Sequence, residues 1–280
     1  MKLKTLKANT DYIRITDLKQ IQLLLLLILK RFHQFCEENG LIYNIFGGTM
    51  LGAVRHGGMI PWDDDIDVTM PRDHYNKMLS LLRENTEGLL TLHAFPDSNY
   101  IYPYAKVGLK GTFLFENVVK AKYNCLSLNI DVFPNDGYPT DESVFQRYNE
   151  IEERIILKAY RLHYPLKRIP VIMIRRLSEM RYSVEYYVGK QVELMSEFDE
   201  KTAEFISCQG AGWGTKGKLK RDVYYDRVLY DFNGMQVWGI RDYDEHLSNL
   251  YGDYMKLPPK EKRGSPHQTD IWVNRKYVDK

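Results

Sequence analysis

The residues best suited to chemistry lie in one short stretch, FGGTMLGAVRHGGMIPWDDDIDV, at positions 46–68. It brings glycine pairs and an arginine next to four aspartates, Asp63, Asp64, Asp65 and Asp67. Carboxylates at this spacing repel one another unless a positive charge lies among them. Because divalent cations such as Mg²⁺ prefer carboxylate oxygens, a bound metal ion is the first hypothesis.

The alternation of apolar and polar residues around these aspartates predicts a strand over 65–70. In such a strand Asp65, Asp67 and Thr69 face one way, and the apolar residues between them face the core. The two carboxylates then lie about 7 Å apart, a gap that a divalent cation with water and phosphate oxygens can bridge. The alternative is a solvated acidic turn, against which the buried apolar residues between the charges argue.

Spacing excludes two familiar acidic and glycine-rich motifs. A calcium EF-hand loop starting at Asp63 needs glycine at its sixth position and glutamate at its twelfth, where this chain has Val68 and His74. The glycines do not have the GxGxxG spacing, and Ala53 follows Gly52 where a P-loop requires lysine.

The glycine pair has a different role in this context. Gly47 and Gly48 follow a predicted buried strand at 41–46 and precede a short predicted helix. They would let the backbone approach a phosphate, Thr49 could hydrogen-bond to it, and the helix N-terminus would add a positive dipole end. With the metal carboxylates brought to the same phosphate, the layout is typical of a nucleotidyltransferase-type active site.

A third carboxylate is expected from a neighbouring strand, LSLNIDVF at 126–133. Its alternate apolar residues would form a core face, which leaves Asp131 on the opposite face with Ser127 and Asn129. A solvent-facing aspartate on an edge strand is the alternative.

The remaining pattern predicts both helices and strands. A helix over 16–40 begins at Thr16 or Asp17 and ends at Gly40, and its leucine run is apolar nearly all round, so we expect it to be covered on most sides. Further expected elements are a helix over 72–85, strands at 100–109, 112–116 and 126–139, helices between 141 and 205 broken at Pro165 and Pro170, a hairpin across Asn233-Gly234 and a short helix after it.

These elements predict an α/β (α+β) fold, in which a nucleotidyltransferase-like mixed sheet is flanked by helices. We expect the whole chain, 1–280, to form one catalytic domain, within which about 141–205 is a helical elaboration.

Composition limits the function classes. The chain has 280 residues, 44% of them apolar, and a net charge of +2, which is too mild to indicate a nucleic-acid partner. Cys36, Cys125 and Cys208 form no CxxC pair, so they indicate neither a zinc framework nor a disulfide scaffold, and they suit a reducing compartment. No signal peptide is recognisable, and the apolar run at 21–29 is too short to cross a bilayer. We expect a cytoplasmic protein.

The segment GGTMLGAVRHGGMIPWDDDIDVTMPRDHY closely resembles the signature of LicD-type phosphotransferases, whose animal relatives include fukutin and the fukutin-related protein. The resemblance extends through YPYAKVGLKGT, NIDVFPNDGYP and LSNLYGDYMKLPP, and so covers roughly residues 16–260. Bacterial members are similar to enzymes that move phosphocholine from CDP-choline onto sugars of teichoic acid or lipopolysaccharide. Others attach different polyol phosphates to surface polymers.

The resemblance implies metal carboxylates at Asp65 and Asp67, with Asp63 close by and Asp131 as the distant partner. The implied metal is Mg²⁺, with Mn²⁺ as an alternative. One departure concerns the strand after YPYA, where relatives often have Lys-Ile-Arg-Asp and this chain has KVGL. Lys106 therefore remains a candidate phosphate ligand, but the arginine is replaced by Gly108.

The implied reaction is an in-line phosphoryl transfer, in which protein groups mainly position and neutralise the reactants. Asp131, or alternatively Asp63, would accept the proton of the sugar hydroxyl. Arg55 and Lys106 would hold phosphate oxygens, with a plain surface salt bridge as the alternative for each. Choline favours aromatic walls, for which Trp62 is nearest to the acidic motif and Tyr102 and Tyr104 flank Pro103, although core packing is the more common role for such residues.

The expected partners are CDP-choline or another CDP-alcohol and a lipid-linked glycan acceptor. The basic stretch at 154–190 suggests either peripheral contact with the inner leaflet of the cell membrane or a core helix with solvated basic flanks. Two other functions stay open: transfer of glycerol- or ribitol-phosphate to a capsular polysaccharide, and a non-catalytic membrane-associated scaffold whose acidic loop is structural.

Overall fold

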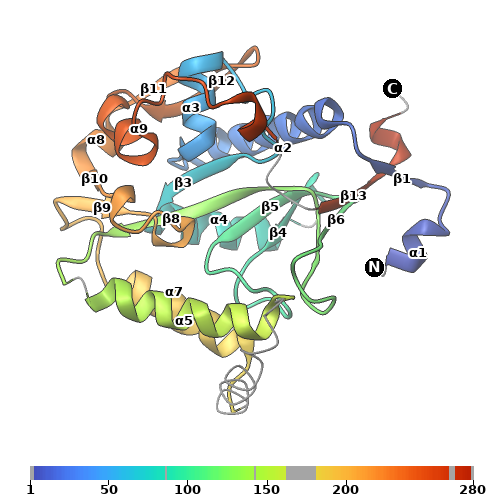
Figure 1. The fold of residues 1–280 in the computed structure, drawn as a ribbon, viewed down its shortest axis with the longest axis horizontal. Coiled ribbons are helices and arrows are strands. Elements are labelled where there is room, and N and C mark those ends of the chain that lie inside the picture. The colour runs from blue at the N-terminus through green and yellow to red at the C-terminus, as the bar shows by residue number, and fades with distance from the viewer. Residues whose placement is uncertain (1–2, 86, 142, 162–180, 265–268, 279–280) are drawn as a thin grey trace.

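The computed structural model describes residues 3–85, 87–141, 143–161, 181–264 and 269–278. A mixed sheet forms its centre, with the strand order β10-β9-β8-β3-β2; β5 also pairs with β8, and β4 pairs with β5 (Figure 1). The bounds of these strands are β2 Asn44–Ile45, β3 Asp67–Pro71, β4 Leu90–His93, β5 Ala105–Leu109, β8 Asn129–Gly137, β9 Phe205–Ser207 and β10 Leu219–Lys220.

The long strand β8 organises this sheet. β3 runs parallel to it along one edge, while β5 pairs antiparallel with its first half and β9 with its last two residues on the other edge. The predicted core face is confirmed, because Leu128, Ile130 and Val132 are fully buried. Since β8 has a partner on each side at Asp131, the alternative of an edge strand is excluded.

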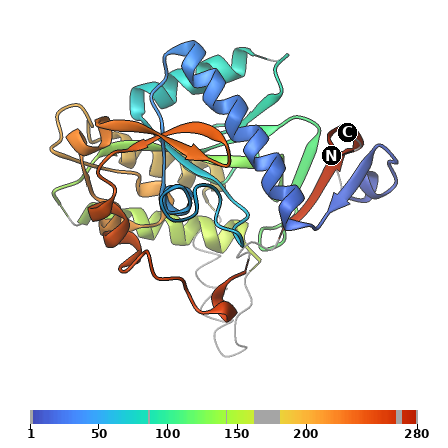
Figure 2. The ribbon, with the colours of Figure 1, turned by 90° about the horizontal axis from the view of Figure 1, so that it is seen from above.

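Helices α2 (Leu18–Asn39) and α4 (Arg72–Glu84) pack against the sheet, and Figure 2 shows α2 crossing over it. Asp17 caps α2 by accepting hydrogen bonds from two backbone amides, and Gly40 ends it in the left-handed conformation, as predicted. The expectation that the leucine run is covered on most sides is confirmed, since Leu23, at 66%, is the single exposed residue of 21–29.

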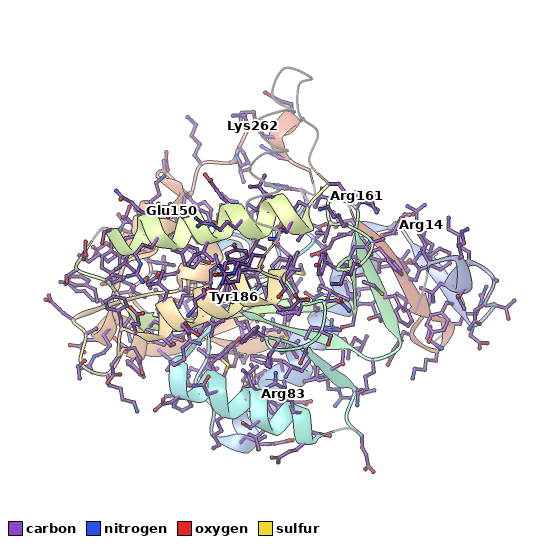
Figure 3. All side chains as sticks on the ribbon, turned by 90° about the horizontal axis from the view of Figure 1, so that it is seen from below. Arg14, Arg83, Glu150, Arg161, Tyr186 and Lys262 are labelled. Atoms are coloured by element: carbon purple, nitrogen blue, oxygen red, sulfur yellow. The ribbon has the colours of Figure 1, made fainter. Side chains whose placement is uncertain are left out.

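Helices α5 (Ser143–Ala159) and α7 (Val184–Ser196) lie side by side, as Figure 3 shows for the helices that carry Glu150 and Tyr186. They confirm the helical prediction for much of 141–205, although β9 begins at Phe205. The predicted break at Pro165 and Pro170 and most of the basic stretch lie outside the described residues. That this region is an elaboration within one domain stays a prediction.

A second sheet, with the order β1-β13-β6-β7, brings the two ends of the chain together (Figure 1). The predicted hairpin is confirmed, since Asn233 and Gly234 both have positive φ between β11 and β12. The other elements are α1 Leu3–Lys7, β1 Tyr12–Ile15, α3 Gly47–His56, β6 Thr112–Glu116, β7 Cys125–Leu126, η2 Gln209–Ala211, η3 Gly214–Gly217, α8 Arg221–Tyr225, β11 Arg227–Phe232, β12 Met235–Ile240, α9 Asp244–Tyr251, η4 Lys260–Lys262, β13 Thr269–Asn274 and η5 Arg275–Tyr277.

The arrangement confirms a mixed fold of helices on sheets, the α/β (α+β) class. Cys36, Cys125 and Cys208 form no disulfide with one another. Within the described part of the chain, no helix combines the length and the apolar character that a membrane span requires.

Candidate active site

Three charged side chains form a row across neighbouring strands. Asp67 on β3 is the register partner of Asp131 on β8, and Asp131 is also the register partner of Lys106 on β5. Because register partners in adjacent strands point to the same face of a sheet, the three side chains share one surface. The Lys106 ammonium donates to both carboxylate oxygens of Asp131, at 2.7 and 2.9 Å.

The acidic segment before β3 is a loop. The prediction that a strand starts at residue 65 was wrong, since β3 begins at Asp67. The reason is that its partner β2 ends at Ile45, and the Phe46 amide makes the last contact by donating to the Asp67 carbonyl before α3 begins. Gln22 of α2 fixes the loop by donating to the carbonyls of Ile60 and Asp63.

Carboxylates crowd together in this loop. One oxygen from each of Asp63, Asp64 and Asp65 lies within 4.8 Å of the other two. Burial and the neighbouring Asp65 carboxylate raise the pKa of Asp63 to about 8. Burial, Asp65 and Asp131 likewise raise the pKa of Asp67 well above its usual range, against the lowering effect of Lys106. Asp63 in the loop and Asp67 at the start of β3 therefore both lie among like charges that favour their protonated forms.

The donor set of this group fits a hard divalent cation such as Mg²⁺, which takes carboxylate oxygens. Of the predicted ligands, Asp63 and Asp65 lie in the loop cluster, while Asp67 and Asp131 lie on the sheet. Asp64 joins the cluster although the sequence analysis assigned it no role. Its place next to Asp63 and Asp65 in a loop, rather than in a strand where adjacent residues point to opposite faces, explains the difference.

The N-terminus of α3 lies against these carboxylates. A Cβ atom on Gly47 would be 3.5 Å from an Asp67 carboxylate oxygen, and one on Gly48 would be 3.2 Å from an Asp63 carboxylate oxygen. Within the described chain, the amides of both glycines lack a hydrogen-bond acceptor, as expected for the first turn of a helix. Glycine at both positions thus leaves open the space between the helix end and the carboxylates.

Thr49 and Thr69 have structural partners. The Thr49 hydroxyl accepts a hydrogen bond from the Asp67 amide at 2.8 Å, so it positions the start of β3. Thr69 shares the Asp67 face of the strand, but it is 1% exposed, because Tyr224 of α8 covers it and donates to its carbonyl. The face that carries the row is therefore open at Asp67 and closed at Thr69.

Lys106 is bound inside the protein rather than in a surface salt bridge. Its side chain is 9% exposed, and its ammonium lies 4.7 Å from the ring centroid of Tyr102 and 5.5 Å from that of Tyr104. Burial lowers the pKa of Lys106, but the nearby carboxylates, led by Asp131, outweigh burial and raise it. The ammonium therefore remains charged beside Asp131.

Gly108, which stands where relatives often have an arginine, lies too close to its neighbours for a side chain. A Cβ atom on Gly108 would lie 1.8 Å from the Ser127 hydroxyl oxygen, so that position admits no side chain while Ser127 stays in place. Ser127 is held by His93, whose Nε2 lies 2.9 Å from its hydroxyl.

Arg55, at the end of α3, is held by the C-terminal part of the chain. Its guanidinium donates to the Tyr254 carbonyl at 2.6 Å and to His56 Nε2 at 3.0 Å. No carboxylate among the described residues forms an ion pair with Arg55, so the predicted alternative of a salt bridge is not found there. The guanidinium of Arg263 lies over the ring of Trp62, 5.1 Å from the ring centroid.

Two aromatic residues at the site were missed by the sequence analysis. The Tyr251 hydroxyl, at the end of α9, lies 3.5 Å from the Cβ position of Gly47. The Trp213 ring packs edge-on against Tyr251, with centroids 5.3 Å apart. The motif LSNLYGDYMKLPP carried the only signal for Tyr251, and nothing in the spacing connected it with the acidic loop.

Comparison with known proteins places the chain in a family. The model described as LicD/FKTN/FKRP, nucleotidyltransferase domain, matches residues 40–175, which include the glycine pair, the acidic loop, Lys106 and Asp131. The chain is also 30% identical, over 91% of its own length and 98% of the relative's, to the lipopolysaccharide cholinephosphotransferase LicD of Haemophilus influenzae. The chain belongs to the LicD family.

Two other proteins match the chain over shorter stretches. An uncharacterized protein of Rickettsia typhi is 31% identical over 48% of this chain and 41% of its own length. The mannosyltransferase regulator 4 of Saccharomyces cerevisiae is 35% identical over 24% of this chain and 6% of its own length.

Proposed function

We propose that this member of the LicD family catalyses the Mg²⁺-dependent transfer of phosphocholine from CDP-choline to a sugar hydroxyl of a cell-surface glycan precursor, releasing CMP. The observation that carries the proposal is its similarity to a lipopolysaccharide cholinephosphotransferase along almost the whole of both chains. The row formed by Lys106, Asp131 and Asp67 beside a helix N-terminus supports it, because carboxylates that can hold a divalent cation next to a helix N-terminus suit the binding of a phosphate.

In the proposed reaction, the sugar hydroxyl oxygen bonds to the phosphorus that bears choline, and the bond from that phosphorus to the bridging pyrophosphate oxygen breaks. CMP leaves with the bridging oxygen, and the hydroxyl proton passes to a carboxylate. We assign this proton to Asp131, which the two hydrogen bonds from Lys106 hold in a fixed orientation.

The donor phosphates would be bound by backbone amides at a helix N-terminus and by a positively charged side chain. The amides of Gly47 and Gly48 are available at the N-terminus of α3, and Arg55 approaches from the end of the same helix. Bound Mg²⁺, held by the carboxylates of the acidic loop and Asp67, would neutralise charge on the pyrophosphate oxygens. The Tyr251 hydroxyl, over Gly47, can donate to a phosphate oxygen.

Trp213 and Tyr251 are the aromatic wall best placed for the choline group. A quaternary ammonium binds against the face of an aromatic ring. Tyr102 and Tyr104 already lie against Lys106, and Trp62 already carries Arg263. Across the described residues, no lysine or arginine lies over the ring of Trp213 or Tyr251, and both side chains are partly exposed, so a ligand cation would not compete there with a cation of the chain.

The acceptor is proposed to be lipid-linked, which would bring the protein to the inner face of the cell membrane.

Transfer of choline from labelled CDP-choline to lipopolysaccharide and teichoic acid precursors, in Mg²⁺ and in EDTA, tests the function. CDP-glycerol and CDP-ribitol serve as competing donors in the same assay. The proposal expects label in a glycan with CDP-choline and Mg²⁺ only. Transfer from CDP-glycerol or CDP-ribitol instead would assign a different polyol phosphate, and no transfer from any donor would favour a non-catalytic role.

A further inference from the structure

A cavity of about 370 Å³ lies beside α9 and is lined there by Glu245, His246 and Asn249. Strands β9 and β10, the turn η3 and the start of α9 form its walls. Its polar lining includes Lys216, Lys218 and Lys220 on one side and Asp242, Glu245 and His246 on the other. The volume falls in the range of small-molecule sites, about 300–1,000 Å³.

His246 is the unusual member of this lining. It is 2% exposed, yet neither of its ring nitrogens has a hydrogen-bond partner in the described chain. One face of its ring lies against Phe46, with centroids 5.0 Å apart. Burial lowers the pKa of His246 to about 4, so at neutral pH the ring presents one donor and one acceptor. A buried imidazole without partners is costly unless a ligand or water supplies them.

The lysines are available as well. Among the described residues, no carboxylate forms an ion pair with Lys216, Lys218 or Lys220. The Lys218 ammonium instead lies 3.9 Å from the ring centroid of Phe205 and 4.9 Å from that of Tyr138. These rings hold the ammonium in place without neutralising it, so it remains ready for an anion.

We propose that this cavity binds a phosphorylated sugar. The lysines match the phosphate, since an ammonium group is a common phosphate ligand. Asp242 and Glu245 can accept hydrogen bonds from the hydroxyl groups of a sugar. Their negative charges argue against a ligand that is a simple polyanion. The neutral His246 at the inner end supplies one further donor and one acceptor for the same ligand.

This cavity is distinct from the proposed transfer centre. His246 lies in the first turn of α9, whereas Tyr251, at the last residue of that helix, faces the acidic loop. Binding there requires neither Mg²⁺ nor CDP-choline, so it can be measured directly and stands or falls apart from the proposed function.

Isothermal titration of the full chain with glucose 6-phosphate, in EDTA, tests the proposal, with glucose and inorganic phosphate as comparison probes. We expect glucose 6-phosphate to bind more tightly than inorganic phosphate and glucose to give no binding. Lys218→Met keeps the apolar stem on Phe205 but removes the charge, and it should weaken binding about tenfold, the value of one hydrogen bond to a charged group. Lys30→Met, at an exposed position of α2 that does not line the cavity, is the matched control and should leave binding unchanged.

A second variant, His246→Gln, retains a donor and an acceptor but moves them, and should also weaken binding while the melting temperature reports folding. Glucose 6-(methyl phosphate) distinguishes the source, because preference for the monoester indicates a free sugar phosphate and equal binding of the diester indicates a phosphate within a glycan. The proposal is overturned if glucose binds as tightly as glucose 6-phosphate, if no probe binds, or if the folded Lys218→Met protein binds like the wild type.

Discussion

Asp67 and Asp131 lie side by side in register on the parallel strands β3 and β8, although they are far apart in the sequence. Lys106 extends the pair into a row by bonding both oxygens of Asp131. Besides burial, Asp65 and Asp131 raise the pKa of Asp67, and Asp65 also raises the pKa of Asp63. The like charges around these carboxylates are the physical basis for several of the predictions that follow.

Asp67→Asn and Asp65→Asn should each abolish phosphocholine transfer and leave the fold intact. Removing a charge from the crowded group also relieves repulsion, so the metal-free Asp67→Asn protein should melt at a higher temperature than the wild type. CMP release and thermal melting measure the two effects. If either variant kept more than a few per cent of wild-type turnover at saturating Mg²⁺, the metal assignment would be wrong.

Lys106→Met should destabilise the protein by about 2–3 kcal/mol, because it leaves the Asp131 carboxylate largely buried without its partner. The double variant Lys106→Met/Asp131→Asn should recover part of this loss, since the unpaired charge is gone. Urea unfolding of the wild type, both single variants and the double variant gives the coupling between the two residues. Additive losses would mean that the ion pair contributes nothing to stability.

In activity assays, Asp131→Asn alone should lower kcat much more than it weakens binding of CDP-choline.

Gly47→Ala should weaken CDP-choline binding and activity sharply. Gly57→Ala is the matched control, because both glycines have positive φ and both changes should cost about 1–2 kcal/mol of stability. A methyl group on Gly47, however, lies against Asp67 and Tyr251, whereas one on Gly57 meets nothing within 4 Å. Equal effects of the two changes on nucleotide binding would show that backbone strain, and not the space beside the carboxylates, explains the glycine.

The metal-free protein should lose stability through Asp63 as the pH rises. Burial and Asp65 raise the folded-state pKa of Asp63 from 3.8 to about 8, so between these values the folded state binds more protons than the unfolded state. The stabilisation from protonated Asp63 is fully present below the unfolded-state pKa of 3.8. It is lost as the pH rises through the folded-state pKa of about 8. Melting temperatures of wild type and Asp63→Asn across this window should therefore converge at low pH and diverge toward pH 8, with the wild type the less stable. Parallel curves would contradict the raised pKa.

Trp213→Leu should raise KM for CDP-choline while changing KM for CDP-glycerol little. The ring offers a face to a quaternary ammonium, a contact worth about 0.5–2 kcal/mol that glycerol cannot make. Steady-state kinetics with the two donors measure the difference. A uniform change for both would assign Trp213 to packing against Tyr251.

Local chemistry predicted much of this site from the sequence. The caps of α2, the Asn233-Gly234 hairpin and the alternating core face of β8 follow from propensity and periodicity, and each is confirmed. Asp131 was identified by the same alternation, because a strand with one buried face fixes which residues face away from it.

Contacts between distant segments were not predictable in this way. The start of β3 depends on where its partner β2 ends, so the strand prediction began too early and placed Asp65 on the sheet. Tyr251 reaches the acidic loop only because α9 packs beside α3, and the pairing of Lys106 with Asp131 depends on the register between β5 and β8. These tertiary relationships leave no trace in local spacing.

Calorimetric titration of the purified protein with CDP-choline, in Mg²⁺ and then in EDTA, tests the central claim most directly. We predict that CDP-choline binds in Mg²⁺, more tightly than CDP-glycerol or CDP-ribitol, and that both EDTA and the Asp67→Asn change abolish its binding. Binding of equal strength in EDTA, or undiminished binding by Asp67→Asn, would contradict the proposal that the carboxylates around Asp67 hold a metal ion for a CDP-choline donor.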